Sequence, residues 1–101
     1  MNDRQMVSAW IEGDERAFES LVRKYFPIVY STALRQVNDP YLAEEIAQSV
    51  FILFSRKAAR LSGNVLLAGW VLRTTRFVAR DALKQRNRRL KREQQAAALG
   101  P

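Results

Sequence analysis

Arginine and lysine recur every three or four residues in the last third of this 101-residue chain. These cations are Arg73, Arg76, Arg80, Lys84, Arg88 and Lys91. On a helix that turns about 100° per residue, this spacing places them along one face, with Arg88 at its edge. A row of cations can follow a row of phosphates, and each neutralised phosphate releases counterions and makes binding salt-dependent. The pattern therefore predicts a helix face that contacts a nucleic acid.

The charge of the chain is divided between its two halves. Residues 1–55 hold five bases and eight acids, whereas residues 56–101 hold twelve bases and two acids. The halves carry −3 and +10, which add to the net charge of +7. A solvated helix face normally mixes both signs, so plain surface explains this face less well. A basic helix on a membrane surface is a weaker alternative, because the opposite face is apolar and must pack a core.

The composition disfavours an enzyme. The chain has no histidine and no cysteine, which removes the commonest general base, disulfides and thiolate metal sites. No cofactor is expected. The N-terminus lacks the pattern of a signal peptide, and no apolar run approaches the roughly 18 residues of a membrane span. We expect a cytoplasmic protein with no membrane partner.

Apolar residues with helical spacing and a few breaking residues predict an all-α fold, a compact bundle of about four helices with the last one long and basic. A short first helix ends before Gly13, and a second begins after Asp14 and runs to about residue 37. Pro27 must kink this second helix or divide it in two. A third runs from Asp39 and its following proline to about residue 56, and a fourth, with Asn64 as a candidate cap, from about residue 65 to 93.

The third and fourth helices each have two different faces. The third is expected to bury Ala43, Ile46, Ala47, Val50 and Phe54, and the fourth to bury Leu67, Trp70, Val71, Thr74, Val78 and Ala82. The outward arc of the third holds Tyr41, Glu44, Glu45, Gln48, Ile52 and Arg56. An apolar residue ringed by polar groups is typical of a protein-docking patch, although plain surface explains the arc as well. Glu44 and Glu45 are a poor catalytic pair, because neighbours on a helix point about 100° apart.

Three blocks of sequence carry a family resemblance. They are residues 13–22 (GDERAFESLV) with Tyr25 and Pro27, residues 43–51 (AEEIAQSVF), and residues 69–73 (GWVLR), which are continued by Arg80-Asp81 and Arg88-Arg89. Their order and spacing resemble region 2 of the extracytoplasmic-function (ECF) sigma factors of bacterial RNA polymerase. The resemblance covers residues 13–92, and each block alone is moderately specific.

The resemblance implies a role in transcription initiation. It implies that Glu44, Glu45, Gln48 and Ile52 dock on the clamp helices of the polymerase β′ subunit. It implies that the loop Arg60, Leu61, Ser62, Gly63 and Asn64 captures a flipped base of the promoter −10 element. The DNA-binding cations would then be Arg73, Arg76, Arg80, Lys84 and Arg88, holding the melted non-template strand. An anti-sigma factor is a further candidate partner.

The chain also departs from the family pattern. The family often has Asn where this chain has Phe77, and an acidic residue where it has Ser49. For Phe77 a core position is favoured over stacking on a base. Asp81 is expected to be the structural partner of a basic side chain. The expected domain is residues 1–93, with 94–101 as a frayed tail or the start of a linker, and the family's second, −35-reading domain is absent from the chain.

Two competing functions remain. The chain could be a general basic helical module that binds nucleic acid without a polymerase partner. It could also be a protein-interaction domain that uses only the outward side of the third helix. Binding to the β′ clamp helices and binding to nucleic acid separate these alternatives from a sigma factor domain.

Overall fold

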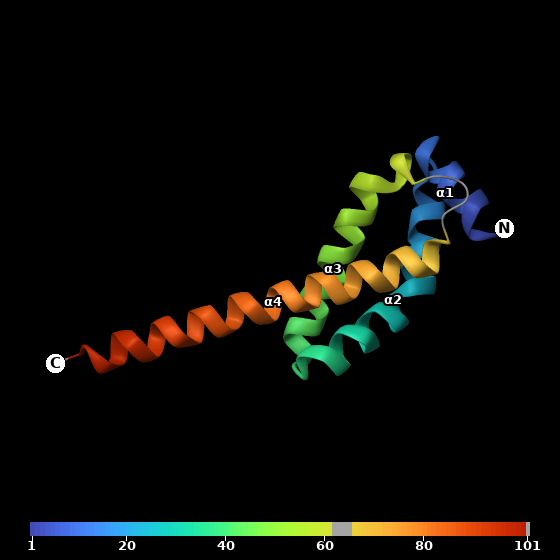
Figure 1. The fold of residues 1–101 in the computed structure, drawn as a ribbon. Helices are drawn as coiled ribbons and strands as arrows, with labels where there is room; N and C mark the ends of the chain where they lie inside the picture. The colour runs from blue at the N-terminus through green and yellow to red at the C-terminus, as the bar shows by residue number, and fades with distance from the viewer. Residues whose placement is uncertain (62–65, 101) are drawn as a thin grey trace.

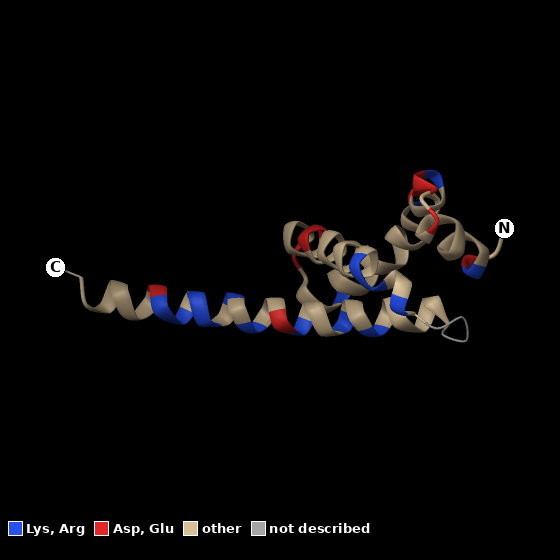
Figure 2. Ribbon diagram, turned by 90° about the horizontal axis from the view of Figure 1, so that it is seen from above, with Lys and Arg blue, Asp and Glu red and all other residues tan. Residues whose placement is uncertain are grey.

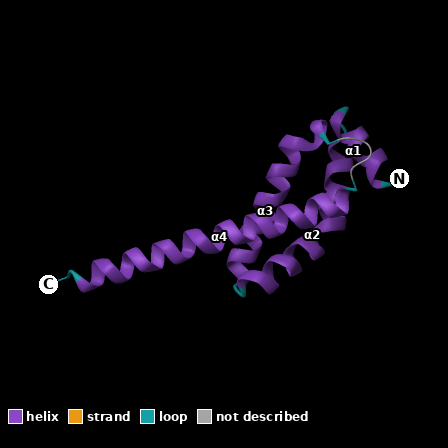
Figure 3. Ribbon diagram, viewed as in Figure 1, coloured by secondary structure: helices purple, strands orange, loops and turns teal. Residues whose placement is uncertain are grey.

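Every regular element in the computed structural model, which describes residues 1–61 and 66–100, is helical (Figure 3). The helices are α1 (Asp3–Ile11), α2 (Glu15–Val37), α3 (Pro40–Lys57) and α4 (Leu67–Ala98). A short 3₁₀ turn, η1 (Ala58–Arg60), follows α3 directly. The predicted all-α bundle of about four helices is confirmed.

Local capping explains where the first helices begin and end. The carboxylate of Asp14 accepts hydrogen bonds from backbone N–H groups two and three residues further on, and Asp39 does the same at the start of α3. Pro40 occupies the first turn of α3, where its missing N–H costs nothing. Asn38 ends α2 in the left-handed conformation, and Gly13 has a φ of +106° that suits only glycine. The boundaries predicted from these residues are confirmed.

Proline at position 27 does not divide α2. The helix runs unbroken from Glu15 to Val37, and Figure 1 shows it changing direction between its first and second halves. Tyr25 and Val29 on either side of the proline are both buried, so packing holds the helix together where a hydrogen bond is lost. Of the two expected outcomes, division into two helices is therefore wrong.

The core lies between α2, α3 and α4, and α1 packs against α2 at one end (Figure 1). The core residues of α2 recur every four positions: Ala17, Leu21, Tyr25, Val29, Ala33 and Val37. The core residues of α3 are the five predicted from its apolar face: Ala43, Ile46, Ala47, Val50 and Phe54. Such four-residue rows are the ridges that let helices pack closely against one another.

The buried face of α4 differs from the predicted one. Its fully buried residues are Leu67, Val71, Thr75 and Ala79. At about 100° per residue, the centre of this row lies about 50° from the centre of the predicted apolar arc. The predicted arc held Thr74 where the structure buries Thr75, whose hydroxyl donates a hydrogen bond to the carbonyl of Val71 at 2.7 Å and is satisfied when buried.

Because the buried row of α4 is displaced from the predicted arc, Phe77 lies outside the core. The Phe77 side chain is 69% exposed, so the expected core position is wrong. Trp70, Thr74, Val78 and Ala82, which were placed on the buried arc, are only half-buried.

The ends of α4 also differ from those expected. The helix begins at Leu67, and its N-cap is Leu66, which has extended backbone and no side chain able to cap. Asn64, the expected cap, lies outside the described residues. The helix continues to Ala98 instead of ending near residue 93, because residues 94–98 are glutamines and alanines, which favour helix strongly.

An aromatic cluster fixes α1 and the start of α4 to the bundle. The ring of Phe54 in α3 lies 6.0 Å from Trp10, 5.9 Å from Phe18 and 5.9 Å from Trp70, measured between centroids. Trp10 and Phe18 stack at 4.7 Å. One residue from each helix therefore meets at the end of the domain where α3 passes into η1.

The molecule is elongated because α4 outruns the other helices. Its overall extents are 61 × 22 × 22 Å, and α4 alone is about 48 Å long at 1.5 Å per residue. Every residue from Asn87 to Gly100 is exposed, and this part projects from the bundle (Figure 1). Within residues 1–61 and 66–100, no helix is both long and apolar enough to cross a membrane.

Asp3 fastens α1 to α2 through polar contacts. Its carboxylate accepts a hydrogen bond from the Tyr25 hydroxyl and forms an ion pair with Lys24, whose Nζ lies 2.6 Å away. Burial alone would raise the pKa of Asp3, but the hydrogen bonds from Lys24 and Tyr25 and the lysine charge outweigh it and lower the pKa. Burial and the contact with Asp3 raise the pKa of the Tyr25 phenol, so it stays protonated and able to donate.

We expect Asp3→Asn to lower the free energy of unfolding by about 1 kcal/mol at pH 7, because the ion pair with Lys24 is lost and the hydrogen bond from Tyr25 loses its charged acceptor. A carboxyl with a lowered folded pKa stabilises above its unfolded pKa, about 3.9, and this contribution disappears as pH falls through the folded value. Urea unfolding from pH 7 to pH 3 measures the difference between wild type and variant, which should shrink below about pH 4.

Glu12→Gln is the matched control for this substitution, since Glu12 is an exposed carboxylate next to the end of α1. Its effect should stay within about 0.5 kcal/mol. A difference between wild type and Asp3→Asn that persists unchanged at pH 3 would contradict the assigned role of the ionised carboxylate.

Candidate nucleic-acid interface

The six regularly spaced cations of α4 are all exposed on one side of the helix. We use the name basic stripe for Arg73, Arg76, Arg80, Lys84, Arg88 and Lys91. From Arg73 to Lys91 the stripe spans about 27 Å along the helix axis. Figure 2 shows the basic residues following one another along α4, while most acidic residues lie on the other helices. The buried row on the opposite side of α4 determines the direction in which the stripe faces.

The basic stripe has no acidic partner in the described part of the chain. The ion pairs there join Lys24 to Asp3, and Arg86 to Asp39 at 3.6 Å. Asp81 accepts a hydrogen bond from Gln85 at 2.9 Å, so the expectation that it pairs with a basic side chain is wrong. Like charges three and four residues apart repel one another on a helix. A bound polyanion would relieve this repulsion and release counterions.

A polar side chain of α2 contacts α4 near the N-terminal end of the stripe. The Gln36 side-chain amide donates a hydrogen bond to the backbone carbonyl of Arg76 at 3.3 Å. The contact joins residues 40 positions apart and ties α2 to the helix that bears the stripe. Sequence reasoning missed Gln36, because one glutamine on a helix gives no signal of a distant partner.

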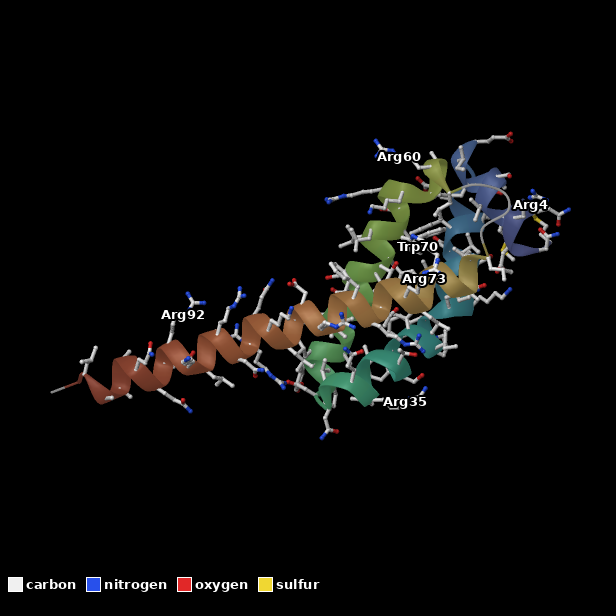
Figure 4. The ribbon with its side chains drawn as sticks, viewed as in Figure 1. Arg4, Arg35, Arg60, Trp70, Arg73 and Arg92 are labelled. Carbon is white, nitrogen blue, oxygen red and sulfur yellow. The ribbon has the colours of Figure 1, made fainter. Side chains whose placement is uncertain are left out.

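Only the first part of the predicted base-binding loop lies in the described residues. Arg60 is exposed at the end of η1 (Figure 4), and Leu61 is half-buried and packs against the core. Ala58 is fully buried and anchors η1, where its carbonyl accepts from the N–H of Leu61 at 3.1 Å. The other predicted loop residues, Ser62, Gly63 and Asn64, lie outside the described residues.

A second exposed surface of different character lies on α3. We name it the α3 face, made by Glu44, Glu45, Gln48 and Ile52. All four side chains are exposed as predicted, and Ile52 is 51% exposed among polar neighbours. Tyr41, one turn before Glu45, is 83% exposed. The α3 face is acidic whereas the basic stripe is cationic, so the two surfaces suit different partners.

A polar hollow separates the α3 face from α4. Its lining includes Glu45 and Ser49 from α3 and Asp81, Gln85 and Arg89 from α4. Two carboxylates and two arginines, Arg86 and Arg89, line this hollow. Within residues 1–61 and 66–100, no three His, Cys, Asp or Glu side chains are placed to hold a metal ion.

Comparison with known proteins agrees with these features. The Sigma-70 region 2 family model matches residues 21–89. The chain is 33% identical over 87 residues to the RNA polymerase sigma-H factor of Pseudomonas aeruginosa, and 30% identical over 73 residues to the RNA polymerase sigma factor CarQ of Myxococcus xanthus. These matches cover 86% and 72% of this chain, and 45% and 42% of the relatives. The chain thus spans about half the length of the curated relatives it matches.

A solved structure shares the fold. It is an engineered region 2 of sigmaE in complex with GTAAAA, determined by NMR, with a TM-score of 0.82 and 28% sequence identity. The similarity covers 89% of this chain and 94% of that one. The class of protein is therefore an all-helical region 2 domain of sigma factors. The chain belongs to the Sigma-70 region 2 family, and the resemblance drawn from its three sequence blocks is confirmed.

We expect Arg80→Gln to weaken binding of single-stranded DNA and to flatten its dependence on salt. Each lost phosphate contact should reduce the slope of log K against log salt by about 0.7 for a single strand. Fluorescence anisotropy with a labelled oligonucleotide, repeated at several salt concentrations, measures both quantities.

Arg16→Gln is the matched control, because it removes the same charge from an exposed arginine on α2. It should leave the slope unchanged. Equal slopes for wild type and both variants would show that Arg80 makes no phosphate contact.

Proposed function

We propose that this chain is the part of a sigma factor that binds the core RNA polymerase and recognises the promoter −10 element. In this proposal the α3 face binds the clamp helices of β′. The basic stripe holds the melted non-template strand, and the loop from Arg60 to Asn64 captures a flipped base. The observation that carries the proposal is a stripe of cations, without acidic partners among the described residues, on the longest helix of a sigma region 2 fold.

The character of the stripe favours a single strand as its ligand. A linear row of about 27 Å can follow one backbone, and contacts with phosphates position a strand without reading its bases. Sequence is then read where a base leaves the stack and enters a pocket. The engineered sigmaE region 2 with the same fold was solved in complex with GTAAAA, which further supports this assignment.

The character of the α3 face favours a protein as its ligand. Ile52 offers an exposed apolar centre, and Glu44, Glu45 and Gln48 surround it with polar groups. Interfaces commonly combine an apolar centre with a polar rim. The acids would also repel DNA, so the strand is directed to α4 and the protein partner to α3.

A basic helical module without a polymerase partner is the second candidate function. The unpartnered stripe alone would suffice for it, since non-specific binding rests on phosphate contacts. The two candidates differ in the α3 face, which only the sigma factor function uses.

We expect Ile52→Glu to reduce affinity for a β′ clamp-helix fragment at least tenfold, because a buried charge would replace the apolar centre of the interface. Single-stranded DNA binding should change less than twofold, since Ile52 lies outside the stripe. Titration of the labelled fragment, followed by anisotropy, gives the first value.

Ile11→Glu makes the same change at an exposed isoleucine on α1 and should leave fragment binding intact. If wild type does not bind the fragment at all, the module without a polymerase partner is the correct function.

We expect Asn64→Ala to reduce discrimination among −10 oligonucleotides in which one base at a time is varied. An amide that hydrogen-bonds a base edge contributes about 1–3 kcal/mol of discrimination, and its loss should act at one position only. Asn87→Ala is the control, because it removes an exposed amide from α4 and should affect all oligonucleotides alike. An unchanged preference profile in Asn64→Ala would remove the loop from base recognition.

A further inference from the structure

Phe77 is an aromatic side chain that the fold leaves in solvent. It is 69% exposed in the middle of α4 and forms no aromatic pair among residues 1–61 and 66–100. The other aromatic residue of α4, Trp70, packs on Phe54 at a centroid distance of 5.9 Å. The packing of the bundle therefore explains Trp70 but gives Phe77 no role in the core.

The ring lies inside the basic stripe. At about 100° per residue, Arg73, Arg80 and Lys84 lie within about 60° of Phe77 around the helix. Along the axis, Arg73 precedes the ring by about 6 Å and Arg80 follows it by about 4.5 Å. Along the axis, cations therefore precede and follow the ring, and all three are exposed. A strand whose phosphates are held by Arg73 and Arg80 would pass beside Phe77, within reach of a base that turns toward the ring.

One exposed apolar residue means little by itself, because protein surfaces commonly contain them. The second observation is the set of unpaired cations on either side of the ring, none of which forms an ion pair in the described part of the chain. Proteins hold single strands with two components: cations that follow the backbone and aromatic rings on which bases stack. The stripe supplies the cations, and Phe77 supplies an aromatic ring among them.

We propose that Phe77 is a stacking platform for an unpaired base of the strand that lies on the basic stripe. The inference rests on the proposed function, since the stripe must first hold a single strand. A base in a duplex is stacked between its neighbours and has no free face, whereas an unpaired base has one. Phe77 therefore selects single-stranded over double-stranded DNA, a preference that cations alone do not provide.

The test compares wild type with Phe77→Ala, Phe77→Leu and Phe77→Trp in the 101-residue chain. We expect alanine and leucine to weaken binding of a single-stranded −10 oligonucleotide about tenfold, because both lack a π face, and tryptophan to retain it. Binding of the matched duplex should change less than twofold. Leu90→Ala, which truncates another exposed apolar side chain of α4, should change neither affinity.

A second readout reports stacking directly. The oligonucleotide carries 2-aminopurine at one position at a time, and its fluorescence changes when the base stacks on an aromatic ring. Wild type and Phe77→Trp should change the fluorescence at one shared position, and Phe77→Ala and Phe77→Leu should not. Thermal melting should be the same for all variants, because the ring is outside the core.

The outcomes separate this inference from the function on which it rests. Equal single-strand affinity and equal 2-aminopurine signals for wild type and Phe77→Ala would overturn the stacking role. Equal loss of single-strand and duplex binding would overturn it as well. Failure of the wild-type chain to bind single strands at any salt concentration would instead overturn the proposed function.

Discussion

The narrow buried row of α4 is the constraint on which the rest of this molecule depends. Leu67, Val71, Thr75 and Ala79 lie four residues apart and are the only residues of α4 that are fully buried. Small side chains at positions 75 and 79 let the helix lie close against α2 and α3. Half-buried residues such as Trp70 and Val78 lie beside this row, and the opposite side of α4 remains in solvent. The direction of this row sets where every cation and the ring of Phe77 point.

The stability of the bundle thus allows a helix that would be unfavourable alone. The six cations, which form no ion pair within residues 1–61 and 66–100, repel one another, and helices in folded proteins gain most of their stability from tertiary packing. The contact of Gln36 with the Arg76 carbonyl and the aromatic cluster around Phe54 hold the first half of α4. The projecting half has no such contacts and carries alanines, glutamines and arginines, which favour helix by themselves. A polyanion would find the charges already arranged in a line.

Much of this arrangement could be predicted from the sequence, because its signals are local. Asp14, Asp39 and Pro40 predicted helix starts by capping alone, and the spacing of the arginines and lysines predicted the stripe before any packing was known. Local signals did not predict which residues are buried where contacts between helices determine burial. The predicted buried arc of α4 held Thr74, whereas packing against α2 and α3 buries Thr75, and the expected core position of Phe77 is wrong as well. The packing around Pro27 and the contact made by Gln36 likewise depend on residues distant in sequence.

The central claim is that a single strand lies on the basic stripe while the α3 face stays free for protein. Titration of the ¹⁵N-labelled chain with a single-stranded −10 oligonucleotide, followed by amide chemical shifts, tests it residue by residue. We expect the shifts to concentrate between Arg73 and Lys91 and near Arg60, with Glu44, Gln48 and Ile52 unaffected. Shifts concentrated on the α3 face or on α1, with α4 unaffected, would contradict the claim.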